Sequence, residues 1–252
     1  MKFSANLGFL WNDRPLPDAI RAAARAGFDA VECHWPYDSP AELVKAALQE
    51  TGLPMISINT SRGDTARGQF GLAALPNHRG DARAAIDQAA NYAHAIGAGA
   101  IHVMCGNAHG PDARACFVEN LQYACTIAQG KTILIEPINP HDAPGYFLHN
   151  PDQAMDIMAA VGHPNLKLMF DCYHMGRSGG DVRALLTALM PHIGHIQCAS
   201  VPDRGTPDHG DVNYADVFAH ITALGWDRPV GAEYKPTTDT DLTLGWMTPK
   251  HG

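Results

Sequence analysis

Four polar residues stand where short apolar runs of the sequence end, and their types suit a metal site. They are Glu136 after TILI, Asp171 after LKLMF, Gln197 after IGHI and Glu233 after VGA. Apolar runs of this length are typical of buried parallel strands. Successive members lie roughly 30 residues apart, about the length of one β-α-β repeat. The spacing therefore predicts that successive strands carry these side chains to one end of a barrel.

Together the four residues offer three carboxylates and one amide oxygen. Hard divalent cations such as Mg²⁺ or Mn²⁺ prefer oxygen ligands, whereas zinc prefers nitrogen or sulfur. Any one of these residues alone would more often be a helix cap or a salt-bridge partner. Their joint occurrence at four successive strand ends favours a site for Mg²⁺ or Mn²⁺.

Two histidines lie close to these positions. His174 follows Asp171 by three residues in FDCYH, and His195 precedes Gln197 by two in GHIQ. Because side chains alternate along a strand, His195 shares a face with Gln197. Each could be a metal neighbour, a proton carrier or a substrate partner, and His174, at the start of a loop above Asp171, is the stronger candidate. His102, within a strand, could equally be a core residue.

The elements that would position these residues alternate along the whole chain. The predicted strands are Lys2–Asn6, Ala30–Glu32, Met55–Asn59, Ala100–Met104, Thr132–Glu136, Lys167–Asp171, Gly194–Gln197 and Val230–Glu233. The predicted helices are Pro17–Ala26, Ala41–Glu50, Asp81–Ile96, Asp112–Gln129, Pro151–Val161, Asp181–Met190 and Tyr214–Leu224. Eight strands separated by helices predict an α/β fold, a single (β/α)₈ or TIM barrel. The length of 252 residues suits that fold, and no linker divides residues 1–252, so we expect one domain.

Three long connections follow strands, at Thr60–Gly80, Pro137–Asn150 and Cys198–Asn213. They are rich in Arg, Asp, His and Gly, as a pocket for a polar small molecule would be. Barrel enzymes place their chemistry at this end of the strands. No GxGxxG or GxxxxGK[ST] motif follows a strand, which argues against the common nucleotide-binding folds.

Composition and charge exclude several classes of partner. The net charge is −8, with no basic stripe of the kind that nucleic-acid binders use, so we expect no nucleic-acid partner. No apolar run reaches membrane-spanning length and the start lacks a signal-peptide core, which indicates no membrane association and a cytoplasmic protein. The six cysteines show no CxxC pair and are typical of reduced core thiols. Homo-oligomerisation stays open.

Several sequence motifs resemble those of a known protein family. They are MKFSANLGFLW, AGFDAVECHWPY, GLPMISINTSRGD, EPINPHDAPGYFLHN, FDCYHM, GHIQCASVPDRG with GDVNY, and GAEYKP. In this order they resemble the hydroxypyruvate isomerase family, including its 2-oxotetronate isomerase branch. That family belongs to the wider group of xylose-isomerase-like TIM barrels, which also contains ketose 3-epimerases. The resemblance covers almost the whole chain.

The resemblance implies roles residue by residue. Glu136, Asp171, Gln197 and Glu233 match the family's positions for a divalent metal, Mg²⁺ or Mn²⁺. Glu136 and Glu233 also match its catalytic acid–base pair. His174, Arg204 and Asp142 match positions that bind substrate in the related epimerases. Apart from the resemblance, Arg62 in the INTSRGD loop is a further candidate to pair with the acidic end of the substrate, and it could equally be a solvated charge.

The implied activity is that of an intramolecular oxidoreductase, an aldose–ketose isomerase of a short sugar acid. The leading reaction converts hydroxypyruvate to tartronate semialdehyde, and 2-oxotetronate is the other expected substrate. Two glutamates would transfer the proton, with an enediolate as the intermediate. The chain has GRSGGD after DCYHM, where the family usually has a glutamine and a glutamate–glycine pair. The alternatives are a ketose 3-epimerase of the tagatose or psicose type and, more distantly, a metal-dependent hydrolase or a non-catalytic sugar-acid binder.

Overall fold

The protein is described by a computed structural model that covers residues 1–247. The last five residues of the predicted domain, 248–252, lie outside the described part. Within residues 1–247 the strands pair in sequence order, β1 to β8, and close into a barrel. The strands are β1 (Phe3–Asn6), β2 (Ala30–Cys33), β3 (Met55–Asn59), β4 (Ala100–His102), β5 (Thr132–Ile135), β6 (Leu166–Asp171), β7 (Ile193–Cys198) and β8 (Val230–Ala232). The predicted TIM barrel is confirmed.

Eight α-helices occur in the described part of the chain. They are α1 (Leu16–Arg25), α2 (Ala41–Thr51), α3 (Arg79–Ile96), α4 (Gly110–Ile127), α5 (Pro151–Val161), α6 (Cys172–Arg177), α7 (Val182–Leu189) and α8 (Tyr214–Ala223). Short 3₁₀ helices span Pro36–Asp38, Thr65–Arg67, Pro76–His78, Met190–His192 and Thr240–Met247. None of the helices in residues 1–247 has the length and hydrophobicity that crossing a membrane requires.

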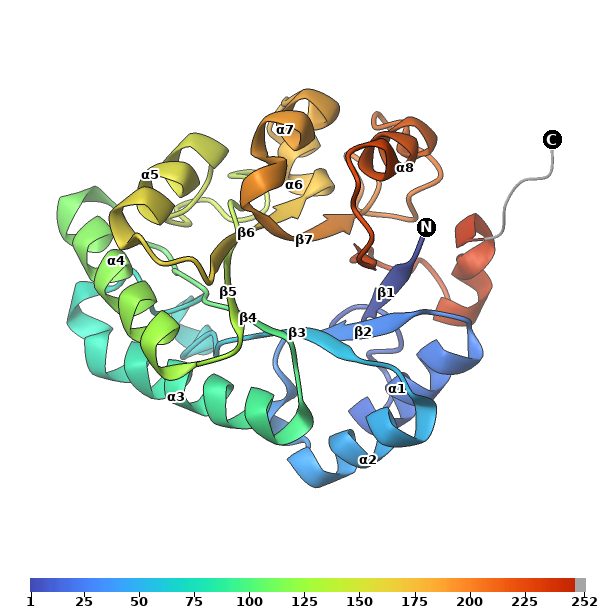
Figure 1. Cartoon of the computed structure of the whole chain (residues 1–252), viewed down its shortest axis with the longest axis horizontal. Coiled ribbons are helices and arrows are strands. Elements are labelled where there is room, and N and C mark those ends of the chain that lie inside the picture. The colour runs from blue at the N-terminus through green and yellow to red at the C-terminus, as the bar shows by residue number, and fades with distance from the viewer. Residues whose placement is uncertain (248–252) are drawn as a thin grey trace. The chain divides into compact units, whose positions relative to one another are not determined.

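The chain divides into two compact units, and the prediction of one domain stays a prediction. The first unit comprises residues 1–56, 171–191 and those from 196 onward. In it β1 pairs in parallel with β2 and with β8, so that Asn6 lies opposite Glu32 and Ala5 opposite Ala232. Helices α1 and α2 pack side by side, as do α7 and α8 (Figure 1). The face of α1 that packs inward carries small residues and one isoleucine, Ile20.

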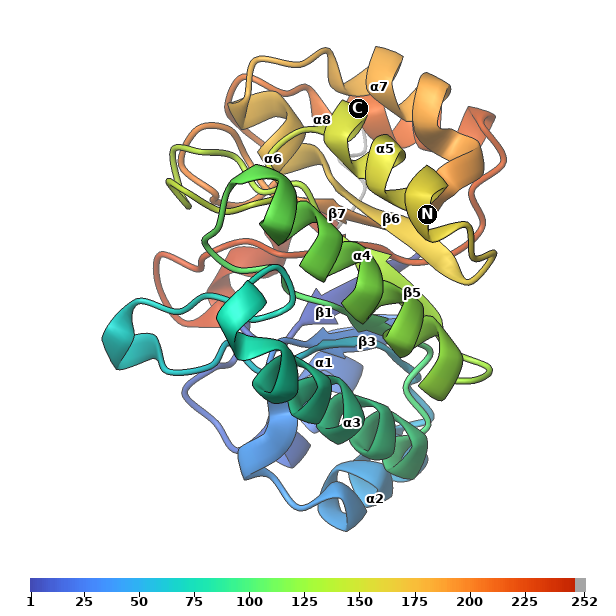
Figure 2. The same cartoon turned by 90° about the vertical axis from the view of Figure 1, so that its left-hand side faces the viewer.

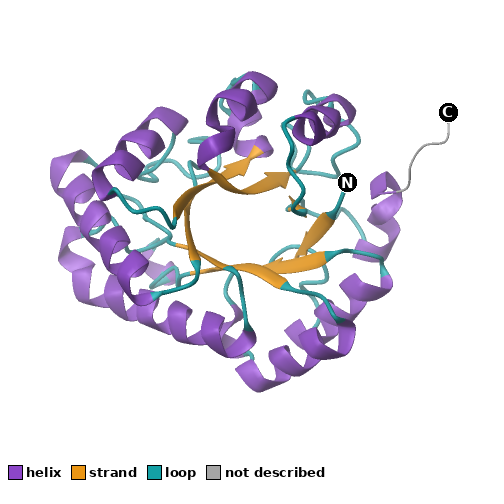
Figure 3. Ribbon diagram, viewed as in Figure 1, coloured by secondary structure: helices purple, strands orange, loops and turns teal. Residues whose placement is uncertain are grey.

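The second unit comprises residues 57–170 and 192–195. Strand β4 pairs with β3 and with β5, and α4 packs between α3 and α5 (Figure 2). Helix α3 forms because alanines and isoleucines recur at helical spacing, and it ends where Gly97 adopts a left-handed conformation, φ 78°. In each unit the helices cover one face of the strands (Figure 3). Strands β4, β5 and β6 of this second unit bury Ala100, Leu134 and Met169 together in one hydrophobic cluster.

The structure adds one helix that the sequence patterns did not predict. His174 was expected to begin a loop, but it lies in α6, a six-residue helix that starts directly after β6. Asp171 caps this helix, because its Oδ1 accepts a hydrogen bond from the backbone N–H of Tyr173 at 2.9 Å. The turn therefore holds the histidine above the end of the strand.

Candidate active site

Glu233 directly follows β8, and three donors hold its buried carboxylate. Arg204 Nη2 donates to Oε1 at 2.7 Å, Asn6 Nδ2 donates to Oε2 at 3.0 Å, and His34 Nε2 lies 3.3 Å from Oε1. Burial raises the pKa of Glu233, but the His34 hydrogen bond and the Arg204 charge outweigh it and hold the pKa at about 2. The carboxylate is therefore ionised at neutral pH.

Asp171 is the last residue of β6 and is completely buried. Its Oδ2 has no hydrogen-bond partner among the described residues. His174 Nε2 and Arg204 Nη2 lie nearby, at 3.6 and 3.7 Å. Burial raises the pKa of Asp171 to about 7, although the Arg204 charge opposes the shift. A buried oxygen without a hydrogen bond costs about 1–3 kcal/mol, so an oxygen in this position suits a bound cation.

Gln197 lies in β7, one residue before the strand ends, and its side chain is buried. Its Nε2 donates to Glu32 Oε1 at 2.7 Å. Its Oε1 has no hydrogen-bond partner within residues 1–247. The amide therefore presents its oxygen, rather than its nitrogen, as the group left to bind a ligand.

Glu136 directly follows β5 and is buried beside His102. Its Oε2 lies 3.7 Å from Nδ1 of that histidine. His102 is buried, as a core histidine would be, and it also lies against a carboxylate that the sequence singled out. An imidazole in this position can stabilise or exchange a proton with Glu136.

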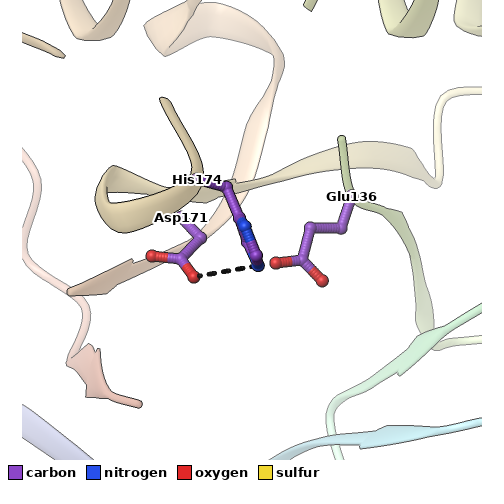
Figure 4. A group of neighbouring side chains, drawn as sticks. All are labelled: Glu136, Asp171 and His174. Carbon is purple, nitrogen blue, oxygen red and sulfur yellow. Dashed lines mark ion pairs between the residues drawn. The ribbon is translucent and has the colours of Figure 1, made fainter. Parts of the chain in front are cut away.

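Asp171 and His174, both in the first unit, each offer a ligand atom that could hold a metal ion. The dashed line in Figure 4 marks the ion pair between these two side chains. His174 adds a nitrogen to the all-oxygen set that the sequence predicted. Together with the oxygens of Asp171 and Gln197 that accept no hydrogen bond within residues 1–247, this nitrogen fits a divalent cation.

Arg204 reaches the acidic side chains from the loop after β7, where it adopts a left-handed backbone conformation with φ 56°. Its guanidinium lies over the rings of Phe9 and Tyr173, 5.0 and 4.9 Å from their centroids. The same loop carries a polar cluster of Ser200, Asp203 and His209, in which His209 Nε2 lies 2.9 Å from Asp203 Oδ2 and 3.0 Å from Ser200 Oγ. These contacts order the segment that delivers Arg204.

Two other predicted substrate-binding residues, Asp142 and Arg62, lie in loops of the second unit. Asp142 is exposed, and Asn139 Nδ2 donates to its Oδ2 at 3.2 Å. Arg62 is half-buried, and its backbone carbonyl accepts a hydrogen bond from the N–H of Gly71 at 2.9 Å. His195 is buried in β7. The substrate roles of Asp142 and Arg62 stay predictions.

Sequence reasoning missed the residues that surround Glu233 and Gln197. Asn6 ends β1, Glu32 lies in β2, and His34 follows β2. The signal was present in FDAVECHW, where a glutamate stands inside an otherwise apolar strand. A charged residue in such a run is almost never buried without partners.

With this geometry in place, comparison with known proteins identifies the family. A family model described as xylose isomerase-like TIM barrel matches residues 20–250. The chain belongs to the xylose isomerase-like TIM barrel family. Within this family it is 44% identical to the 2-oxo-tetronate isomerase of Cupriavidus necator, over 100% of this chain and 99% of that protein. It is 36% identical to the hydroxypyruvate isomerase of Escherichia coli, over 99% of each. The resemblance seen in the sequence motifs is confirmed.

Solved structures of other proteins share the fold. One described as an AP endonuclease, family 2, from Brucella melitensis has a TM-score of 0.94 and 35% identity, covering 99% of this chain and 98% of that one. A D-allulose 3-epimerase from Methylomonas sp. has a TM-score of 0.78 and 21% identity, covering 97% and 94%. At that identity the epimerase shows a common fold alone.

Proposed function

We propose that the chain is a metal-dependent aldose–ketose isomerase of a short sugar acid. The substrates would be hydroxypyruvate, converted to tartronate semialdehyde, or 2-oxotetronate. Full-length relatives named for both activities support this assignment. The observation that carries it is Glu233, a buried carboxylate held ionised beside Asp171 and Arg204. The cytoplasmic location expected from the sequence stays a prediction.

Glu136, Asp171, Gln197 and Glu233 are the residues that would hold Mg²⁺ or Mn²⁺, with His174 as an added candidate. The ion would supply Lewis-acid stabilisation of negative charge on the substrate oxygens. Asp171 Oδ2 and Gln197 Oε1 support this assignment, since each is buried and accepts no hydrogen bond within the described residues.

The chain's own residues would move the proton. Isomerisation removes a hydrogen from the carbon that bears the hydroxyl and returns one to the neighbouring carbonyl carbon. Of Glu136 and Glu233, one would accept this proton as a carboxylate and the other, as a carboxylic acid, would donate a different proton to the neighbouring carbon, while the hydroxyl proton passes to the former carbonyl oxygen. His34 and Asn6 would keep the Glu233 carboxylate oriented during this transfer. Their hydrogen bonds leave it little rotational freedom.

Arg204 is the proposed partner of the substrate's own carboxylate. Its guanidinium carries a permanent charge and a planar fork of donors, which suit a carboxylate. Phe9 and Tyr173 hold it in place by their rings. Its Nη2 donates to Glu233 Oε1, so a substrate carboxylate would compete for the same donor. His174 would contact a substrate oxygen or the metal.

A substrate panel tests the proposal. Hydroxypyruvate, tartronate semialdehyde, 2-oxotetronate, fructose and tagatose are each supplied with the purified chain, in EDTA and with Mg²⁺ or Mn²⁺. We expect turnover of a short keto acid that EDTA abolishes and added metal restores. Epimerisation of the ketoses alone would replace the isomerase with the epimerase alternative. Cleavage of abasic-site DNA, with no turnover of the acids, would refute the proposal in favour of a nuclease, a result that the net charge of −8 argues against.

Glu233→Gln tests the acid–base role. We expect kcat to fall about 10²- to 10⁴-fold, the usual contribution of a positioned general acid or base, since an amide cannot exchange the proton. The matched control is Glu50→Gln, which changes an exposed glutamate of α2 paired with Arg21. Near-native kcat for Glu233→Gln, with metal added, would refute the role.

A further inference from the structure

Glu32 is a charged residue with almost no exposure, 1%, that the proposed reaction does not use. Two oxygens of its carboxylate accept hydrogen bonds from three side chains. Ser4 Oγ donates to Oε2 at 2.9 Å, Asn6 Nδ2 to Oε1 at 3.0 Å, and Gln197 Nε2 to Oε1 at 2.7 Å. Ser4 and Asn6 share one face of β1 because they are two residues apart, and Asn6 lies opposite Glu32 in the strand pairing.

The contact with Glu32 decides which way the Gln197 amide points. A side-chain amide has one oxygen that accepts and one nitrogen that donates. A carboxylate only accepts, so the nitrogen must face Glu32 and the oxygen must face away. That oxygen has no hydrogen-bond partner within residues 1–247, although it is buried. An orientation that leaves a buried acceptor unsatisfied is the one that a cation would require.

Glu32 orients a second site residue through Asn6. The Asn6 Nδ2 that donates to Glu32 also donates to Glu233 Oε2, at 3.0 Å in both cases. Its Oδ1 is held by the backbone N–H of Gly8 at 2.9 Å. The asparagine amide therefore cannot turn over without losing all three contacts. The Glu32 carboxylate thus contacts Gln197 directly and reaches Glu233 through Asn6.

Gly231 makes room for this arrangement. It lies opposite Gln197 in the pairing of β7 with β8. A Cβ atom at this position would lie 2.7 and 2.8 Å from the two carboxylate oxygens of Glu32 and 2.9 Å from Cγ of Gln197. Contacts this short do not occur without a shift of the neighbours. Glu32 can therefore contact Gln197 only because position 231 of β8 is a glycine.

We propose that Glu32 is a positioning residue, which turns the Gln197 amide oxygen and the Glu233 carboxylate toward the substrate and a divalent cation. The cation part rests on the proposed function. Glu32 itself contacts neither, since it acts through Gln197 and Asn6. Partners that orient metal ligands typically change affinity about 10- to 100-fold when they are replaced.

A double-mutant cycle tests the proposal by Mn²⁺ binding, measured by electron paramagnetic resonance on substrate-free protein. Glu32→Gln presents an amide to Gln197, which lets that amide turn over, so we expect the Mn²⁺ dissociation constant to rise about 10- to 100-fold. In a Gln197→Ala background there is no amide to orient, so Glu32→Gln should add little further loss. An effect of Glu32→Gln that is equal in both backgrounds would indicate a merely structural role and overturn the proposal.

Two further variants keep the test decisive. Glu50→Gln, an exposed glutamate, should bind Mn²⁺ as the wild type does. If Glu32→Gln does not fold, Gly231→Ala takes its place, because it crowds the same carboxylate without removing it. Folded Gly231→Ala with wild-type Mn²⁺ affinity would then overturn the proposal. Wild-type protein that binds no Mn²⁺ would overturn the metal part of the proposed function as well, whereas unchanged affinity in Glu32→Gln would overturn this inference alone.

Discussion

Replacing Arg204 by alanine should destabilise the protein strongly, because it leaves two buried carboxylates without their nearest cation. The guanidinium lies 2.7 Å from Glu233 and 3.7 Å from Asp171, and its own side chain is only 12% exposed. Removing one partner of a buried charge pair costs about 3–5 kcal/mol. Since His34 and Asn6 would still hold Glu233, we expect the lower end, about 3 kcal/mol.

Thermal unfolding of the substrate-free protein in EDTA measures this loss. For a chain of this size, 1 kcal/mol shifts Tm by about 2–4 °C, so Arg204→Ala should lower Tm by about 6–12 °C. Arg204→Lys keeps the charge but loses the planar stacking against Phe9 and Tyr173. Its Tm should therefore lie between that of the wild type and that of Arg204→Ala.

The matched control for this loss is Arg21→Ala. Arg21 pairs with Asp18 and Glu50 at the exposed surface of α1, where ion pairs contribute little. Its replacement should leave Tm close to that of the wild type. A similar Tm for Arg204→Ala and Arg21→Ala would refute the reasoning, because it would mean that the buried carboxylates do not depend on Arg204.

Two other predictions concern the loop after β7 and the cysteines. Hydrogen bonds from His209 and Ser200 outweigh burial and lower the pKa of Asp203 to about 2, while the same pairing raises the pKa of His209 above 6.5. The pair should thus stabilise the protein most between pH 3.8 and 6.5, and less as the pH falls toward 2 or rises through the raised pKa of His209. The Tm difference between wild type and His209→Ala, followed across this range, should peak there, and a difference that does not vary with pH would contradict the pairing. All six cysteines are buried, and burial raises the pKa of Cys33 and Cys105 to about 12, so a thiol reagent at neutral pH should label the native protein far more slowly than the unfolded chain. Rapid labelling of the native protein would show that these thiols are accessible.

The barrel and the approximate ends of its strands could be predicted from the sequence. Glu136, Asp171, Gln197 and Glu233 were singled out because each is a polar residue directly after or near the end of an apolar run; the structure places all four there and buries them, and their roles in the site stay predictions. The boundaries shifted by one or two residues, as at β4, which ends at His102 rather than at Met104. Such ends depend on local hydrogen bonding rather than on hydrophobicity.

Helix α6 could not be predicted from periodicity because six residues are too few to show it. The helix starts directly after Asp171, whose Oδ1 caps it by accepting a hydrogen bond from the N–H of Tyr173. The other carboxylate oxygen, Oδ2, accepts no hydrogen bond within the described residues. The hydrogen bonds of Glu32 could not be predicted either, because they join β1, β2 and β7. Such contacts depend on the register between strands, which the local sequence does not determine. The reach of Arg204 depends on a left-handed backbone conformation that arginine rarely adopts.

The central claim is that this chain moves a proton between adjacent carbons of a short keto acid. The most direct measurement is nuclear magnetic resonance of the products formed from hydroxypyruvate and from 2-oxotetronate, with wild-type protein and added Mg²⁺ or Mn²⁺. We predict a product in which the carbonyl has moved by one carbon, with no such product in EDTA or with Glu233→Gln. Unchanged acids, or a product whose proton returns to the same carbon, would contradict it.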